Sequence, residues 1–398
     1  MGRTAWRCCN GVLLLLTVHF VLHTSPVLGA AAQPARALEY SVKWDAAEVA
    51  YDWSSDKCDD NQIPDSPVRA FRTSTNSVVM VASHYDNKFF IGETLKEVRP
   101  SCSSRFSGKM DPNPKSFDAR VWLQTFFTED GKNIYALGSS DYHASWFGQC
   151  KGVDKSQLGC WQNAIVLANS SNSGESFSSG AVGARIIAKP PEQRPGRNSE
   201  IGYFSTSNIV KRDGYYYTLI AMRGMPGKKA GNCLARTDDL SLAPNWRYWN
   251  GREFSGRFLK DDGSPEAELC HPISLDAGII RSLLWHTPSE QFIAVYSRRK
   301  VEKTSLGTVL HISFIASTSK DLLTWSEPSV IADVPSPKPC DRGMIYGEYP
   351  SIIDPESKDR NFGTIGDHGY LFFTRFNGTP SCQRSLDRDL IRVPISIK

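Results

Sequence analysis

Residues 116–140 read SFDARVWLQTFFTEDGKNIYALGSS and decide the fold class of this chain. Two apolar, aromatic-rich runs lie on either side of Glu-Asp-Gly-Lys, residues 129–132. An Asp-Gly pair between such runs is a strong signal for a β-hairpin. Asp118 stands where the first strand would begin, and the polar residues 138–143 stand where the second strand would end. The segment therefore predicts two antiparallel strands whose polar ends meet at one edge.

Weaker copies of the same pattern recur along the chain. Glycine and proline are frequent, with 30 and 23 residues, aromatic residues make up 11%, and short β-branched and aromatic runs alternate with turn residues. This pattern is typical of an all-β protein. Each copy has an inner run, a turn and a second run that ends in a polar cluster, and the five copies span residues 66–92, 116–168, 208–246, 282–325 and 350–397. Five such units predict a five-bladed β-propeller with four strands per blade.

No linker or low-complexity segment divides residues 38–398, so we expect a single propeller domain over this range. Residues 38–53 can supply a strand that pairs with the last blade and closes the ring.

The 116–140 segment resembles the second blade of five-bladed β-propeller glycosidases of the glycoside hydrolase family 43 type. The shared features are the strand-opening Asp118, the Asp-Gly-Lys turn and the Tyr135-x-Leu137 pattern that follows. The resemblance covers most of the mature chain as an architecture, and only the second and third units as sequence motifs. Residues 170–177, SSNSGESF, also resemble the Asp-box of sialidases, a structural turn remote from the sialidase active site. Both resemblances imply a propeller.

Residues 1–29 are expected to be a signal peptide. Arg3 and Arg7 precede an apolar run over residues 11–22 that is too short to span a bilayer, and small residues follow at 29–32, as at a cleavage site. An uncleaved signal anchor is the alternative. No later segment is apolar enough to span a membrane, so we expect a soluble, secreted monomer without membrane contact after cleavage.

Eight cysteines remain beyond residue 29, and an even number in a secreted chain indicates disulfides. Sequence leaves their pairing open, although Cys150 and Cys160, which bracket a short loop, are the best candidate for a local bridge. Asn169 and Asn377 begin glycosylation sequons. A net charge of +4 without a basic run gives no support for a nucleic-acid partner.

No cofactor is expected from the cysteine and histidine pattern. The sequence has no Cys-x-x-Cys spacing and no tight set of His, Cys and Asp that would predict a transition metal. A Ca²⁺ ion on the propeller axis is implied only by the resemblance.

Polar residues gather at the strand ends that a propeller brings to one funnel. The openings of the inner runs carry Asp65, Asp118, Glu200 and Glu348. The closings of the second runs carry His84, Asp141, His143, Arg223, Arg298 with Arg299, and Arg375, and Arg69 lies on an inner run.

Glycoside hydrolysis requires one carboxylic acid and one carboxylate. The resemblance implies a base at Asp65, a helper at Asp118 and an acidic Glu at the start of the third blade. Residues 205–207, however, are Ser-Thr-Ser where the family has Glu-Gly-Pro. Glu200, five residues earlier, and Glu348 in the fifth unit are therefore the candidate acids. The alternative is that Asp65 and Asp118 only bond backbone amides at strand starts.

The other polar residues are candidate sugar-binding groups. Arginine suits an acidic sugar, or else these arginines neutralise the nearby carboxylates. His84 and His143 can bind sugar hydroxyls, or are ordinary structural histidines. We predict a secreted glycoside hydrolase that acts on a poly- or oligosaccharide, with an acidic one as a specific hypothesis. The alternatives are a sialidase-like enzyme and a lectin-like propeller without catalysis, which the missing Glu-Gly-Pro favours.

Overall fold

The computed structural model describes Gly2 and residues 35–155, 157–191, 200–265, 268–275, 277–304, 307–335, 346–378 and 385–398. Except for Gly2, the predicted signal peptide lies outside these residues. Cys340, Cys382 and Thr379 of the second sequon also lie outside them. Contacts group residues 34–398 into one compact unit. Helices are single turns, namely η1 (Trp44–Ala46), α1 (Trp53–Asp56), η2 (Ala144–Phe147), α2 (Val182–Arg185) and η3 (Ala243–Asn245). The protein is all-β, as predicted, and no helix in this part is long and apolar enough to cross a membrane.

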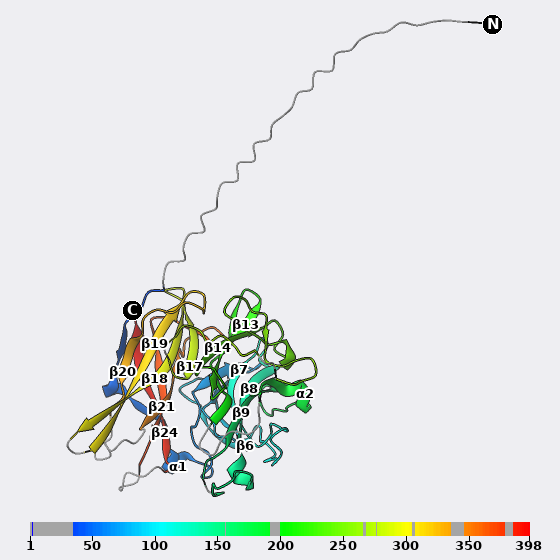
Figure 1. Ribbon diagram of the computed structural model, residues 1–398. Helices are drawn as coiled ribbons and strands as arrows, with labels where there is room; N and C mark the ends of the chain where they lie inside the picture. Colours follow the sequence, from blue (N-terminus) through cyan, green and yellow to red (C-terminus); the bar gives the residue numbers. More distant parts are fainter. Residues whose placement is uncertain are drawn as a thin grey trace. The chain divides into compact units, whose positions relative to one another are not determined.

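The strands of the described residues form four hydrogen-bonded sheets (Figure 1). The first is an antiparallel meander of β3 (Arg69–Arg72), β4 (Val78–Val81), β5 (Lys88–Gly92) and β6 (Arg99–Ser104).

A ten-stranded sheet follows, built from two antiparallel sets that meet where β9 and β11 run parallel. The first set is β7 (Arg120–Phe127), β8 (Ile134–His143), β9 (Trp161–Ser170) and β10 (Ile186–Ala188). The second set is β11 (Glu200–Thr206), β12 (Val210–Arg212), β13 (Tyr215–Arg223), β14 (Gly231–Thr237), β15 (Arg247–Tyr248) and β16 (Gly256–Arg257).

The two remaining sheets contain the C-terminal strands. One is β17 (Ile280–His286), β18 (Gln291–Thr304), β19 (Gly307–Ser319) and β20 (Ser329–Asp333), with β22 (Thr364–Ile365) parallel to β17. The other is β21 (Gly347–Ile353), β23 (His368–Phe376) and β24 (Arg388–Ile397), which β1 (Tyr40–Val42) and β2 (Glu48–Tyr51) complete by pairing with β24. The N-terminal residues thus complete the last sheet, as the sequence predicted.

The hairpin predicted from residues 116–140 is formed by β7 and β8. Its turn is stabilised by Asp130, whose carboxylate accepts hydrogen bonds from the backbone amides of Lys132 at 2.8 Å and Asn133 at 2.7 Å. Gly131 has φ +73°, and its carbonyl accepts a 2.9 Å hydrogen bond from the amide of Ser74. The turn between β7 and β8 therefore contacts the turn between β3 and β4. This contact joins the two sheets to which the turns belong.

The first strand of the third unit lies earlier than the sequence predicted. We expected it to begin at Asn208, but β11 spans Glu200–Thr206 and pairs with both β9 and β13. The predicted run instead contributes the short β12. Gly202 makes the parallel contact with β9 possible, because its φ is +133° and a Cβ there would overlap the backbone of Asn163. Sequence patterns do not register such a close approach of two backbones.

Aromatic rings form the core between the first sheet and the β7–β9 set. The ring centroids of Phe71, Phe89, Phe126 and Phe177 lie 5.5–5.9 Å apart in the contacting pairs, and all four residues are buried. Aromatic pairs in such arrangements contribute about 0.5–1.5 kcal/mol each beyond their area burial. Phe177 closes the Asp-box-like segment, so that segment serves packing, as predicted.

Three disulfides cross-link the described part of the chain. They join Cys58 to Cys102, Cys150 to Cys160 and Cys233 to Cys270. The local bridge expected between Cys150 and Cys160 is confirmed.

We predict that Gly131→Ala destabilises the protein by about 1–3 kcal/mol, because the left-handed backbone strains any side chain there. A Cβ at this position would also overlap the backbone of Thr73 and Ser74. Urea unfolding followed by tryptophan fluorescence measures the change. Gly183→Ala is the matched control, since a Cβ at this helical glycine meets nothing within 4 Å. Equal stability of the two variants would contradict the assigned role of the turn.

Candidate active site

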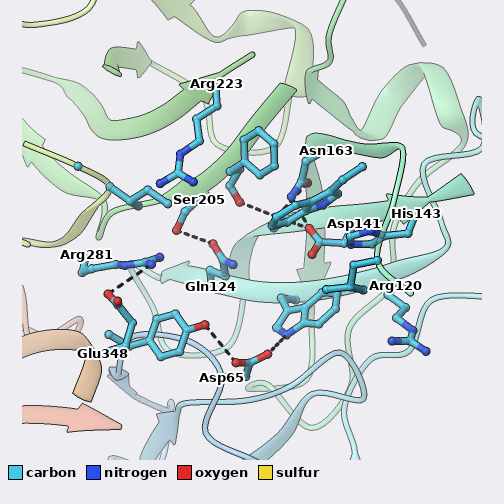
Figure 2. A pocket seen from close by; sticks show the side chains of 18 of the residues that line it. Asp65, Arg120, Gln124, Asp141, His143, Asn163, Ser205, Arg223, Arg281 and Glu348 are labelled. Atoms are coloured by element: carbon cyan, nitrogen blue, oxygen red, sulfur yellow. Dashed lines mark hydrogen bonds and ion pairs between the residues drawn. The ribbon is translucent and has the colours of Figure 1, made fainter. Parts of the chain in front are cut away.

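A pocket of about 700 Å³ lies against one face of the ten-stranded sheet (Figure 2). This volume is within the range of small-molecule sites. Alternate residues of a strand point to the same face, and here they are polar or aromatic. They are Arg120, Trp122 and Gln124 of β7, Ser139, Asp141 and His143 of β8, and Trp161 and Asn163 of β9.

The antiparallel register arranges these side chains in rows. Asp141 is the direct partner of Arg120 on one side and of Asn163 on the other. In the same way His143 is the partner of Trp161. Directly opposed residues have Cβ atoms about 4.5–5.5 Å apart. Strand pairing alone therefore places Asp141 between a cation and an amide.

The rest of the pocket wall comes from eight other parts of the chain. The residues are Asp65 before β3, Trp146 of η2, Leu158, Phe204 and Ser205 of β11, Arg223 of β13, Gly278, Ile279 and Arg281 at β17, Ser297 and Arg299 of β18, and Glu348 and Tyr349 of β21. Figure 2 shows Asp65 and Glu348 on one side of the pocket and Asp141 and His143 on the other. A 3.0 Å hydrogen bond from the Ser205 hydroxyl to Gln124 joins β11 to β7 within the pocket wall.

Asp65 is held by donors on several sides. The indole Nε1 of Trp122 donates to it at 3.3 Å, the hydroxyl of Tyr349 donates at 3.1 Å, and Arg388 forms an ion pair with it. His84 Nε2 lies 3.8 Å away. Because these partners donate, the acceptor that satisfies them is the ionised carboxylate. Asp65 is therefore an oriented anion at the edge of the pocket.

Tyr349 has a strained backbone that aims its hydroxyl at Asp65. Its φ is +60°, a region that costs a residue other than glycine about 1–3 kcal/mol. The Arg281 guanidinium lies 4.8 Å from the ring centroid. A stacked cation on the ring and a carboxylate on the hydroxyl thus fix Tyr349 in place, and it in turn positions Asp65.

Asp141 is the carboxyl group most altered by the pocket. Burial, with a further contribution from the charge of Asp65, raises the pKa of Asp141 to about 7. Hydrogen bonds from Ser139 and Asn163 oppose this shift without cancelling it. Both hydrogen bonds end on Oδ1, so Oδ2 remains for a proton and a ligand. At neutral pH this group exchanges a proton readily.

His143 does not share that proton. It lies between two indoles, with its ring centroid 4.2 Å from that of Trp146 and 4.9 Å from that of Trp161. Burial and the charge of Arg120 lower the pKa of His143 to about 4. The ring is neutral at physiological pH, and within the described residues its contacts in the pocket are with the two indole rings.

Glu348, one of the two candidate acids, is unsuited to donate a proton. Burial alone would raise its pKa, but the charges of Arg281 and Arg299 and hydrogen bonds from Arg299 and Ser297 lower it. Arg281 lies 3.6 Å away and the Ser297 hydroxyl 2.8 Å away. Glu348 lines the pocket as predicted, but as an ionised group that orders two arginines.

Two carboxylates named from the sequence lie outside the pocket lining. Asp118 is buried two residues before β7, where it pairs with Arg185 at 3.4 Å and accepts a backbone hydrogen bond from Lys109. Glu200 begins β11 and pairs with Arg223 at 3.0 Å. Of the four carboxylates predicted at strand openings, Asp65 and Glu348 line the pocket.

Most of the arginines named from the sequence form ion pairs with carboxylates of the protein or donate hydrogen bonds to backbone carbonyls. Arg69 is buried and donates to three backbone carbonyls, of Val68, Thr206 and Arg281. Arg375 pairs with Asp389 at 2.6 Å, away from the pocket lining. The alternation of β18 exposes Arg298 and turns Arg299 into the pocket. Of the arginines named for an acidic sugar, Arg223 and Arg299 line the pocket, whereas Arg69, Arg298 and Arg375 do not.

The remaining residues named from the sequence lie close to their expected surroundings. His84 packs against Tyr85 and Trp122, beside Asp65. Asn169 is exposed on β9, as a glycosylated residue must be. The amide of Asn377 donates to Asp387 and Asp389. Glycosylation of either asparagine stays a prediction.

Sequence reasoning missed many of the residues that line the pocket, among them Arg120, Trp122, Gln124, Trp146, Trp161, Asn163, Arg281 and Tyr349. A signal was present in the first of them. Polar or aromatic residues at 120, 122 and 124 alternate with apolar Val121 and Leu123, which predicts a strand with one lined face. The prediction from strand ends does not include this face.

The described residues contain no group of three or more His, Cys, Asp or Glu side chains placed to hold a metal ion. The pocket carboxylates are bonded to protein donors instead. The Ca²⁺ ion implied by the resemblance stays a prediction.

No protein-family model and no curated protein sequence matches this chain. Among solved structures, it is similar to the endo-arabinase of Bacteroides thetaiotaomicron VPI-5482, with 13% identity, a TM-score of 0.48 and coverage of 88% of this chain and 98% of that one. It is also similar to the α-L-arabinanase of Cellvibrio cellulosa, with 11% identity, a TM-score of 0.44 and coverage of 83% and 90%. A third similar structure is the xylan β-1,4-xylosidase of Bacillus halodurans C-125, with 11% identity, a TM-score of 0.42 and coverage of 85% and 54%.

The likeness is to glycosidases. The motifs in the sequence predicted such a distant resemblance. At TM-scores below 0.5 the matches assign no activity and no residue role to this chain, so we infer function from the pocket alone.

The raised pKa of Asp141 predicts that this residue makes the folded protein less stable as the pH rises. Between about pH 4 and 7 the folded protein retains a proton that the unfolded chain has lost, so the free energy of unfolding falls across this window. His143, whose pKa is lowered, acts in the opposite direction between about pH 4 and 6.5. The difference between wild type and Asp141→Asn isolates the carboxyl group.

Urea unfolding at pH 4.5 and at pH 7.5 measures this difference. Asp141→Asn should gain stability relative to wild type at the higher pH. If the difference in free energy of unfolding between wild type and Asp141→Asn is the same at both pH values, the raised pKa of Asp141 is contradicted.

Proposed function

We propose that this protein is a secreted glycoside hydrolase in which Asp141 is the general acid and Asp65 is the base or nucleophile. One observation carries the proposal: a single pocket contains two carboxyl groups in opposite surroundings, one that favours the protonated form and one that favours the ionised form. Asp141 retains a proton up to about pH 7, whereas Asp65 accepts hydrogen bonds and an ion pair from donors. Pairs of carboxyl groups with such opposed surroundings identify the acid and the base of glycosidases.

The two groups divide the reaction between them. Asp141 Oδ2 would donate its proton to the glycosidic oxygen as the bond to the anomeric carbon breaks. Asp65 would act on the anomeric carbon, either directly or through a water molecule from which it takes a proton. Trp122, which donates to Asp65, and Tyr349 would hold that carboxylate in place during the attack.

The aromatic rings of the pocket support a carbohydrate ligand. Trp122, Trp146, Trp161 and Phe204 line the cavity, and flat rings offer a large apolar face with, for indole, a polar edge. Gln124, Ser139 and Asn163 add amide and hydroxyl groups that can bond sugar hydroxyls. Aromatic faces beside polar groups suit a sugar ring, which is apolar on its face and carries hydroxyl groups at its edge.

We further propose that the strands form a five-bladed propeller. Five successive antiparallel sets support it, beginning at β3, β7, β11, β17 and β21. The pairing of β1 and β2 with β24 would close the last blade. Three disulfides and the charged and apolar pattern of residues 1–29 support export from the cell.

A lectin-like propeller is the second candidate. Ser205 stands in the pocket where the resemblance would have a glutamic acid. If Asp141 does not replace that acid, the pocket would bind sugars without cleaving them.

We predict that Asp65→Asn and Asp141→Asn each lower turnover of a natural glycan by two or more orders of magnitude, the usual size of a general acid or base effect. Asp141→Asn should regain activity on an aryl glycoside with an activated leaving group, which needs little protonation, whereas Asp65→Asn should not. The kcat/KM of the wild type should fall above about pH 7, as Asp141 loses its proton.

Glu200→Gln is the matched control, because this carboxylate was a candidate acid but lies outside the pocket lining. Product release is followed by chromatography on a panel of oligosaccharides. Full activity of Asp141→Asn on natural glycans would disprove its role. A wild-type chain that binds glycans and releases no product would establish the lectin.

A further inference from the structure

We propose that the pocket takes an anionic sugar and that Arg120 binds its acidic group, a carboxylate or a sulfate ester, beside Asp141. The inference rests on the proposed carbohydrate function and names the class of the substrate.

The arginines around the pocket differ in whether a carboxylate already neutralises them. The ion pairs are Arg223 with Glu200, Arg388 with Asp65, and both Arg281 and Arg299 with Glu348. In the group of Arg281, Arg299 and Glu348, one carboxylate pairs with two guanidinium groups. These arginines are engaged in holding the protein's own carboxylates.

Arg120 is different. It lines the pocket, yet within the described residues its guanidinium forms no ion pair and donates no hydrogen bond, and its buried Nε has no partner. A guanidinium without an acceptor in a partly dry site loses hydration that nothing in the protein replaces. An anionic oxygen from a ligand would restore it.

Two aromatic rings orient this guanidinium. Its central carbon lies 4.6 Å from the ring centroid of Tyr85 and 4.1 Å from that of Trp146. Stacking on rings fixes the plane of the group and leaves its edge for acceptors. That edge matches the paired oxygens of a carboxylate or sulfate. Because the plane is fixed in advance, little side-chain freedom is lost when the anion binds.

The position of Arg120 ties the anion to the reacting bond. Arg120 and Asp141 are cross-strand partners, and Figure 2 places both on the side of the pocket away from Arg281 and Glu348. The acidic group would therefore belong to the sugar whose glycosidic oxygen Asp141 protonates, or to its neighbour.

The charge of the whole site agrees with this ligand. Among the described residues in and directly behind the pocket, five guanidinium groups face four carboxyl groups, of which Asp141 is protonated for much of the time at neutral pH. The pocket therefore retains positive charge, which attracts an anionic substrate and raises its rate of association.

Binding to the full chain tests the proposal with pairs of probes that differ only in charge. The first pair is trigalacturonate and its methyl ester, and the second is a sulfated and an unsulfated galactan oligosaccharide of equal length. Calorimetric titration at pH 7 gives the affinities, and chromatography follows product release separately. The two pairs distinguish a carboxylate from a sulfate ester.

We expect the wild type to prefer the acidic member of at least one pair by about tenfold or more, as for a charge-assisted, two-pronged hydrogen bond. Arg120→Ala should lower that affinity to the level of the neutral member, which should itself change little. Arg120→Lys retains the positive charge but not the planar guanidinium, so its affinity for the acidic probe should lie between those of the wild type and Arg120→Ala. Arg298→Ala is the matched control, because it removes the same charge from an exposed position on β18 outside the pocket.

Near-ultraviolet circular dichroism checks that each variant is folded. If Arg120→Ala does not fold, the comparison of Arg120→Lys with Arg298→Ala decides. Equal affinity for both members of each pair, equal losses in the Arg120 and Arg298 variants, or no binding of any probe would overturn the inference. A preference for the acidic probe without product release would support the anion subsite and overturn hydrolysis.

Discussion

The antiparallel register of β7, β8 and β9 is the constraint on which the site depends. Arg120, Asp141 and Asn163 stand in one row because their strands pair in that register. A slip by one residue would turn all three away from the pocket. Val121 and Leu123, on the other face of β7, are buried in the core and prevent the slip. The apolar residues that hold the sheet together therefore also align the acid with its neighbours.

The charges of the pocket are arranged by that same packing. Asp65 and Glu348 are brought to the pocket with donors already in place, so their negative charges are satisfied by protein. Asp141 comes from the interior of a sheet and has only neutral donors on one oxygen. Its proton affinity follows from this difference in surroundings. Identical side chains thus acquire distinct chemistry from the strands that present them.

The sequence predicted the strands more fully than the site. Turn residues and apolar runs located β7 with β8, the β18 region and the pairing of the N-terminal segment, because these depend on local chemistry. It placed the start of the third unit too late, since β11 depends on a close backbone contact at Gly202. Asp118 looked like a site residue because it precedes a strand. Its partner, Arg185, comes from a helix far along the chain, and no local pattern reveals such a pair. Asp65, Asp141, His143, Arg223 and Glu348 were named in advance, but their roles depend on neighbours contributed by other sheets.

The pairing of β1 and β2 with β24, strands far apart in the sequence, has a consequence for biosynthesis. Glu39 and Lys398 exchange backbone hydrogen bonds, and β1 and β2 have β24 as their partner. Because β1 and β2 are synthesised long before β24, they must wait unpaired for it. Contacts of such long sequence separation slow folding and leave strand edges open to other chains in the meantime. Completion of this sheet is thus a late event in folding, and a chain that lacks β24 would leave β1 and β2 with exposed edges.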